Sequence, residues 1–203
     1  MEIKRLLEKL SSDTPTPGGG SASALAGTLS ASLILMTAGL SLRKGNLEGK
    51  EIREIKKKVL TIQKRLFRAI QEDAESYQAV LKAFRLRKGT ERERVIRTKA
   101  IQKAFQGATV TPQLVCRHSI QLLGYSKVLI QKGNPNAISD AGVAAYLADA
   151  ALKGGMLNIG INLGPIRDQG FRKNLGSLVG KLEKKRRELL EQVQKALGKA
   201  LPI

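Results

Sequence analysis

An aspartate interrupts the apolar face of a long helical segment in the first half of the chain. Asp73 falls among Leu66, Ile70 and Leu81, where the helical period calls for another apolar residue. Tyr77 follows one turn later on the same face. Burying a carboxylate among apolar side chains is costly unless it is paired or functional. We therefore predict either a structural ion pair with a Lys or Arg of another helix or an acid–base site. Asp73 and Tyr77 are the candidate catalytic residues.

A run of glycines opens directly into an uncharged segment. Gly18, Gly19 and Gly20 are followed by Ser21, and free amide groups at such a helix start can bind an anion. The run lacks the Lys-Ser/Thr ending of a nucleotide-binding P-loop, which disfavours ATP. The alternative is a flexible cap that permits tight packing. These four residues are candidate ligand-binding residues.

Polar residues flank an alanine-rich segment in the second half of the chain. The candidates for ligand binding are Asn134, Asn136, Asp140, Asn158 and Asn162. At about 100° per residue, Asp140 and Asn158 lie on one helix face, but their 18-residue offset separates them by about 27 Å. They therefore need different partners within one subunit. The alternatives are helix capping by Asp140 with Ser139, and interhelical hydrogen bonds by the asparagines.

The chain contains one cysteine and one histidine. This inventory excludes disulfide frameworks, thiolate zinc clusters and multi-histidine metal sites. His118 lies on an apolar stripe with Leu114 and Leu122, which predicts a core or interface histidine, and Cys116 is predicted to be a small buried apolar side chain. We predict no metal and no cofactor.

The apolar residues of the chain recur with the helical period, which predicts the helices that hold these candidate residues. Between Lys50 and Lys88 there is no glycine or proline, and apolar residues recur at steps of three, four and seven, which predicts a helix of about 52 Å. Thr90 and Glu93 have the spacing of a capping box. A second long helix should therefore start at residue 91 and run toward residue 131, interrupted around Pro112.

An apolar helix over residues 139–163 and a basic helix over residues 168–201 complete the chain. No segment shows the alternation of a β-strand. The sequence predicts an all-α fold, an elongated antiparallel helical bundle with long helices, as a single domain over residues 1–203.

The segment 14–42 carries no charged residue. Its length suits a membrane span, but serines and threonines interrupt it, so we predict a helix buried in protein and no membrane association. Gly20, Ala24, Gly27 and Ala31 form a small-residue stripe that lets helices approach closely. This places the helix at the centre of the subunit or across an interface, and predicts a homodimer. The amino terminus is not a signal peptide, so we expect a cytoplasmic protein.

Basic residues outnumber acidic ones by 36 to 17, a net charge of +19, in a chain that is 42% hydrophobic and 26% charged. This composition is globular rather than disordered. The basic runs over residues 85–99 and 181–187 indicate solvated helix faces or an anion-binding surface. The chain has only seven aromatic residues, none interleaved with the basic runs, so no base-stacking surface is visible and nucleic-acid binding is disfavoured.

Taken in order, these motifs resemble the cyclodeaminase/cyclohydrolase family. The motifs are Pro17 to Ser21, the EDAESY segment with Asp73 and Tyr77, Gly133 to Asp140, and Asn158 to Leu163. The resemblance implies an all-helical homodimeric enzyme of tetrahydrofolate one-carbon metabolism that needs no metal. Hydrolysis of 5,10-methenyltetrahydrofolate is the favoured activity, because no formiminotransferase domain is attached. Formiminotetrahydrofolate cyclodeaminase is the alternative, and a basic non-enzymatic module that binds nucleic acid or anions is the rival of another class.

The resemblance also implies roles for the candidate residues. Asp73 is the acid–base group and Tyr77 orients it, while the glycines, Ser21, the asparagines and Asp140 bind the folate. Nearby Lys and Arg residues would meet the glutamate carboxylates of a folate that can be polyglutamylated.

Overall fold

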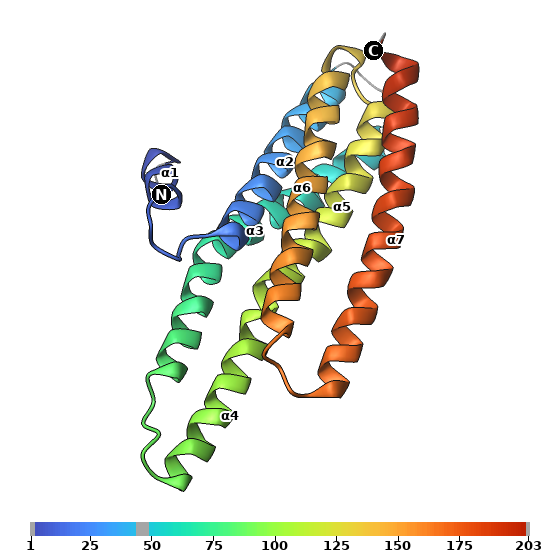
Figure 1. Cartoon of the computed structure of the whole chain (residues 1–203). Helices are drawn as coiled ribbons and strands as arrows, with labels where there is room; N and C mark the ends of the chain where they lie inside the picture. The colour runs from blue at the N-terminus through green and yellow to red at the C-terminus, as the bar shows by residue number, and fades with distance from the viewer. Residues whose placement is uncertain (1–2, 44–48, 202–203) are drawn as a thin grey trace.

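The computed structural model describes residues 3–43 and 49–201, and every regular element in these ranges is helical (Figure 1). Apart from the short α1, the helices are long and run up and down the molecule, and their all-helical structure confirms the predicted all-α class. Their bounds are α1 (Ile3–Leu10), α2 (Gly19–Arg43), α3 (Gly49–Phe84), α4 (Glu91–Ala108), α5 (Val110–Lys132), the 3₁₀ turn η1 (Pro135–Ala137), α6 (Ile138–Leu163) and α7 (Gln169–Ala200).

Helix α2 is the uncharged helix, and it packs against α3, α5 and α6. Gly27 shows why small residues are needed there, since a methyl group at this position would lie 3.1 Å from Leu66 of α3 and 3.5 Å from Ala151 of α6. α2 is also long and apolar enough to cross a membrane, a property that core helices share. In the fold its small residues let α3 and α6 each pack closely against it.

The predicted start of the second long helix is confirmed in atomic detail. Thr90 caps α4: its hydroxyl accepts a hydrogen bond from the Glu93 amide (3.2 Å), and the Glu93 carboxylate accepts one from the Thr90 amide (3.0 Å). The expected interruption is confirmed too, with α4 ending at Ala108 and α5 beginning at Val110. The break falls just before Pro112, which has no amide hydrogen and fits the first turn of a helix, where that hydrogen has no intrahelical acceptor.

The turn between α5 and α6 lies at the upper end of the bundle in Figure 1, beside the end of α2. The Asn134 amide donates to the Ser41 hydroxyl (2.8 Å), and the Asn134 side chain accepts from the Asn136 amide (3.0 Å). Asp140 lies in the first turn of α6, whose start has no side-chain cap. The alternative role of Asp140 as the cap of this helix is therefore wrong, because the cap position is Ala137 and Asp140 lies inside the helix.

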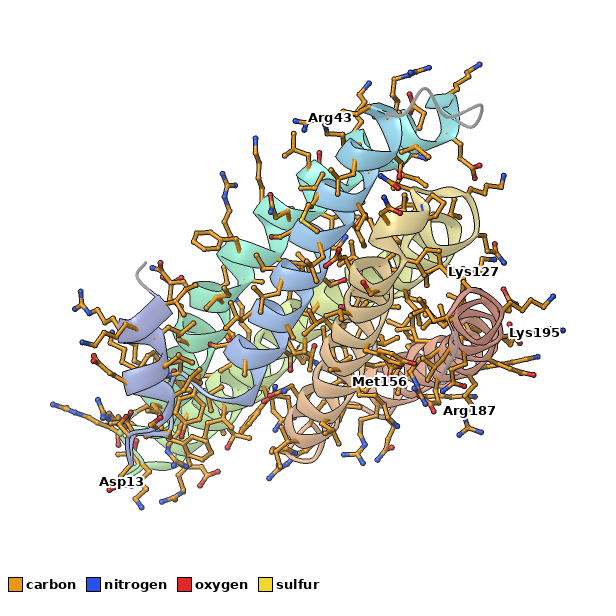
Figure 2. All side chains as sticks on the ribbon, turned by 90° about the horizontal axis from the view of Figure 1, so that it is seen from above. Asp13, Arg43, Lys127, Met156, Arg187 and Lys195 are labelled. Carbon is orange, nitrogen blue, oxygen red and sulfur yellow. The ribbon has the colours of Figure 1, made fainter. Side chains whose placement is uncertain are left out.

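Charged side chains gather on the outside of the bundle. Figure 2 shows Lys127, Arg187 and Lys195 projecting away from the helix axes around α5 and α7. Lys127 reaches only as far as Gln192 of α7 (3.0 Å). The basic run at the end of α3 and in α4 is also mostly exposed, from Arg85 to Lys99. The excess charge is thus peripheral.

One charged cluster is partly buried between α6 and α7. Arg186 bonds to Asp149 (2.6 Å) and to Glu183 (2.9 Å), and its side chain is only 11% exposed. The hydrogen bond from Arg186 is the main reason that the pKa of Glu183 falls from 4.5 to about 2. Arg187 also contacts Glu183 (3.0 Å), but its side chain is 74% exposed. The cluster fixes the position of α7 against α6.

We expect Arg186→Met to lower the melting temperature by roughly 5–10 °C, because two partly buried carboxylates lose their shared partner at a cost of about 2–3 kcal/mol. Arg187→Met is the control and should shift it by less than about 2 °C. Because the folded-state pKa of Glu183 is depressed, its stabilisation is present above pH 4.5 and is lost as the pH falls toward 2. Thermal melts over this range should show a weaker acid dependence for Arg186→Met; an unchanged dependence would contradict the assignment.

Candidate active site

A cavity of about 470 Å³ opens between the N-terminal end of α2, the second half of α3, the end of α4 and the end of α6. This volume suits a small organic ligand. Its polar lining includes Asp73, Tyr77, Asn158 and Asn162, with Gly18, Gly19 and Gly20 beside them. The fold therefore brings together candidates from three separate sequence motifs. Within the described ranges, Asp73 is the one carboxylate in the lining, and no Lys, Arg or His lines it.

The Asp73 carboxylate lies against the first turn of α2. A methyl group at Gly20 would overlap both the carboxylate carbon and its oxygens, so this position requires a residue without a side chain. Burial raises the pKa of Asp73 above its usual value, and hydrogen bonds from the Ser21 side chain and backbone partly oppose this shift. A carboxyl group with a raised pKa is better matched to proton transfer near neutral pH than an ordinary aspartate.

Ser21 lies beneath the cavity rather than in its lining. It is fully buried, and its hydroxyl lies 2.8 Å from the Ile70 carbonyl and 3.2 Å from the Asp73 carboxylate. Ser21 is therefore not among the residues that line the cavity, and direct ligand binding by Ser21 stays a prediction. A hydroxyl has one hydrogen, so a Ser21 that donates to Ile70 leaves its lone pairs for a protonated Asp73. Ser21 thus positions Asp73 in either protonation state.

The two asparagines of α6 present their amide oxygens as acceptors. The Asn158 amide nitrogen donates to the Gly154 carbonyl (2.8 Å), and that of Asn162 donates to the carbonyls of Ala108 (3.1 Å) and Asn158 (3.0 Å). These carbonyl partners fix which end of each amide is the nitrogen. In the part of the chain that the structure describes, neither amide oxygen has a protein donor, so both are available to N–H groups of a ligand.

An apolar wall completes the cavity. Tyr77 is 37% exposed and stands between Asp73 and this wall. The wall comprises Val80, Leu81, Phe84, Phe105, Ala108, Ile161 and Pro165. Leu81 and Phe84 continue the Asp73–Tyr77 face of α3, so helical spacing could have identified them. Phe105 and Pro165 carry no such signal, because their place depends on how α4 and the α6–α7 loop pack. The hydroxyl of Thr16, also at the cavity, is buried without a protein partner in the described ranges.

Asn134, Asn136 and Asp140 are not in this cavity. They lie where α5 turns into α6, about 27 Å along α6 from Asn158. As expected from the offset, one chain cannot bring Asp140 and Asn158 together. Within a single subunit their placement contradicts a shared folate cleft.

The remaining candidates lie away from the cavity. Cys116 is fully buried in the core, its thiol 3.6 Å from the Leu152 carbonyl, and burial raises its pKa to about 12. His118 is half-buried beside Gln121 (3.3 Å), and burial lowers its pKa. Neither side chain lines the cavity, in agreement with their predicted structural roles. The described residues contain no group of three or more His, Cys, Asp or Glu side chains that could hold a metal ion.

Comparisons with known proteins point to one family. The family model described as formiminotransferase-cyclodeaminase matches residues 2–181. A methenyltetrahydrofolate cyclohydrolase of Methylorubrum extorquens is 34% identical over 83% of this chain and 82% of its own length. A formimidoyltransferase-cyclodeaminase of Gallus gallus is 29% identical over 82% of this chain, which spans only 31% of that protein.

A solved structure agrees with these sequence matches. The formiminotetrahydrofolate cyclodeaminase of Thermotoga maritima superimposes with a TM-score of 0.87 at 28% identity, covering 98% of this chain and 96% of that one. The family match covers the glycine run, the Asp73 segment and α6, which together build the cavity. This chain therefore belongs to the formiminotransferase-cyclodeaminase family.

Proposed function

We propose that this protein hydrolyses 5,10-methenyltetrahydrofolate to 10-formyltetrahydrofolate. The observation that carries the proposal is Asp73, a half-buried carboxyl with a raised pKa, fixed by Gly20 and Ser21 at the wall of a 470 Å³ cavity. The M. extorquens relative, named for this activity, supports the choice of reaction. The apolar wall suits the aromatic parts of a folate, and the two asparagine oxygens suit the N–H groups of its pterin ring.

The reaction needs one group that first accepts and then donates a proton. Water attacks the amidinium carbon of the substrate cation, and Asp73 takes a proton from it as the C–O bond forms. The hydroxyl of the resulting adduct loses its proton as the formyl C=O forms, while Asp73 returns its proton to N5 as the C–N5 bond breaks. One proton is released overall. The substrate is already cationic and electrophilic, so we propose that no metal or cofactor takes part.

Tyr77 is placed to orient the attacking water. It lies one helical turn from Asp73 on the same face of α3, and both line the cavity. Its hydroxyl can hold a water molecule beside the carboxylate, and holding the water in a reactive position lowers the entropic part of the barrier. Tyr77 is therefore proposed as an orienting residue, with Asp73 carrying the proton.

Formiminotetrahydrofolate cyclodeaminase is the second candidate, favoured by the T. maritima structure. In that reaction N10 attacks the formimino carbon and ammonia leaves, and the same carboxyl would move the proton. Assays of methenyl hydrolysis and formimino deamination on one purified sample decide between them. Hydrolysis alone supports the proposal, deamination alone replaces it, and neither activity would remove both.

We also propose a homodimer that pairs the outer faces of α2 and α6. These helices lie side by side, joined by the Ser30 hydroxyl and the Ala144 carbonyl (2.8 Å), and both pack on α5 so that their other faces point outward together (Figure 1). The exposed large apolar residues of these two helices are Leu29, Met36, Val143, Tyr146, Leu157 and Ile161. So many exposed apolar residues on two neighbouring helices are typical of a subunit interface.

Symmetry makes this face self-complementary. Ala150, a small exposed residue between Tyr146 and Leu157 of α6, permits two α6 helices to cross closely. A two-fold axis at this point makes the paired helices antiparallel. The beginning of the partner's α6 then approaches Ile161 at the cavity rim. This arrangement would explain why the Asn136–Asp140 motif is absent from the cavity of a single chain.

We expect Tyr146→Glu to convert the dimer to a monomer, because the interface would bury two unpaired charges. Light scattering after size exclusion measures the change. Val95→Glu, which places the same charge on an exposed apolar residue of α4, is the control and should stay dimeric. A wild-type protein that elutes as a monomer at micromolar concentration would contradict the interface.

We further propose that the α3–α4 tip attracts the glutamate tail of the folate. The Arg97 guanidinium lies 5.6 Å from the Phe84 ring centre and donates to the Phe84 carbonyl (3.2 Å). Because Phe84 lines the cavity, this places a positive charge at the edge of the cavity. Arg87 and Lys88 are exposed in the same tip. A tail that leaves the cavity past Phe84 would enter this positive field.

Raising the salt concentration from about 50 to 500 mM should therefore raise KM for a pentaglutamate substrate several-fold more than for the monoglutamate, since salt screens exposed charges. Replacing Arg87 and Lys88 with Gln should remove most of this difference. The matched control replaces Lys184 and Lys185 of α7, an equal loss of charge away from the cavity. Equal salt sensitivity for both substrates would contradict tail recognition.

A further inference from the structure

Helix α4 forms one wall of the cavity but contributes almost no buried side chains to the core. Its Phe105 and Ala108 line the cavity, and Ala108 is the only buried residue of α4, a helix that the structure describes throughout. The Phe105 ring meets the Phe84 ring of α3 edge-on, with centres 6.0 Å apart. The last residue of α4 is tied to α6 by the Asn162 bond to the Ala108 carbonyl. The earlier turns of α4 contain no buried residue, so their position relative to α6 depends on another contact.

Gln102 makes that connection to the α6–α7 loop. Its side-chain nitrogen donates to the Pro165 carbonyl (2.9 Å), and its side-chain oxygen accepts from the Arg167 amide (2.7 Å). Pro165 lines the cavity. Within residues 3–43 and 49–201, these are the side-chain hydrogen bonds between α4 and this loop. Both ends of the side-chain amide are bonded. The two bonds therefore fix the orientation of α4 relative to the loop and the distance between them.

The loop that Gln102 contacts is itself firmly anchored. The Arg172 guanidinium of α7 donates to the carbonyls of Leu163 (2.9 Å), Gly164 (3.1 Å) and Ile166 (3.1 Å). The Ile166 side chain is 2% exposed. A hydrogen bond to this loop therefore ties α4 to the body of the bundle rather than to a mobile segment.

We propose that Gln102 is a positioning residue that holds the α4 wall against the α6–α7 loop and thereby fixes the width of the folate cavity. Gln102 does not line the cavity and touches no reacting atom. It acts through Phe105 and Ala108, which it keeps opposite Ile161 and Pro165. The inference rests on the proposed folate function, but its structural part, the attachment of α4, can be measured without substrate.

The test is Gln102→Met, which keeps the length of the side chain and removes both hydrogen bonds. We expect KM for 5,10-methenyltetrahydrofolate to rise about 3- to 10-fold, as loss of one or two neutral hydrogen bonds allows, with kcat within twofold. Backbone amides of residues 91–108 should exchange faster with deuterated water, while those of α5 should not change. Gln106→Met, one turn further along α4 and outside the cavity lining, should behave as wild type in both measurements.

Two further variants make the outcome decisive. Gln102→Asn retains the amide but is one carbon too short to span both partners, so it should resemble Gln102→Met; wild-type behaviour would overturn the proposal. Arg172→Met loosens the same loop. The double variant should therefore raise KM by less than the product of the two single-variant fold-changes. If wild type turns over neither folate, the proposed function fails, and the exchange rates still test the attachment. Active wild type with an unchanged Gln102→Met would overturn the positioning role alone.

Discussion

Asp73→Asn should lower kcat for methenyl hydrolysis by about 10²- to 10⁴-fold, the range expected when a general acid–base group is lost. The amide has nearly the shape of the carboxyl group, so it can stay beside Gly20 and Ser21 and still contact the folate. KM should therefore change by less than about threefold. Purified variant and wild type are compared by loss of the methenyl chromophore and by substrate binding under single-turnover conditions.

The pH profile supplies an independent check on this role. Burial raises the pKa of Asp73, so the acid limb of the wild-type profile should lie above the range of an ordinary aspartate. Activity should be present above this pKa, where the carboxylate is free to accept a proton from water, and should fall below it. The residual activity of Asp73→Asn should lack this limb. If the variant binds and turns over folate normally, or if the limb persists in it, Asp73 is not the acid–base group.

Gly20→Ala is expected to have the second largest effect, a loss of about 10²-fold in kcat with the fold intact. The added methyl group would overlap the Asp73 carboxyl, which must then move away from α2 and from the Ser21 hydroxyl. A displacement of about 1 Å at a reacting group costs rates of this size. Kinetics and far-ultraviolet circular dichroism on the same samples separate loss of activity from loss of helix.

A neighbouring glycine provides the control for this substitution. A methyl group at Gly19 would meet its nearest atom, the Asn158 amide nitrogen, at 3.7 Å, which is ordinary contact. Gly19→Ala should therefore retain kcat within a few-fold, although it carries the same change in helix propensity. Equal losses in both variants would show that the reaction depends on flexibility of the glycine run, and not on room for Asp73.

The helices were predictable because their signals are local. The apolar period of α3, the Thr90–Glu93 capping box and the break before Pro112 all depend on residues within a few turns of one another. Asp73 and Tyr77 could be selected for the same reason, since a carboxylate within an apolar stripe is visible from helical spacing alone. Leu81 and Phe84, which also line the cavity, could have been selected from the same stripe.

The parts that escaped prediction depend on contacts between distant segments. Ser21 resembles a ligand-binding residue in a glycine-rich run, but the approach of α3 covers it and turns its hydroxyl toward Ile70 and Asp73. Asn134 and Asn136 belong to a turn whose bonds are local or reach Ser41 at the far end of α2. The contact of Gln102 with the α6–α7 loop joins residues more than 60 positions apart and has no sequence pattern.

The chemical inertness of Cys116 has a practical consequence for spectroscopy. It is the only cysteine of the chain, it is fully buried, and its pKa of about 12 leaves almost no thiolate at neutral pH. Cysteines introduced on the surface would thus be the only readily alkylated thiols, without first replacing the native one. One spin label or fluorophore at exposed Lys88 and another at Lys181 would report the distance between the α3–α4 tip and α7 directly. The wild-type background is already suited to following that distance during turnover.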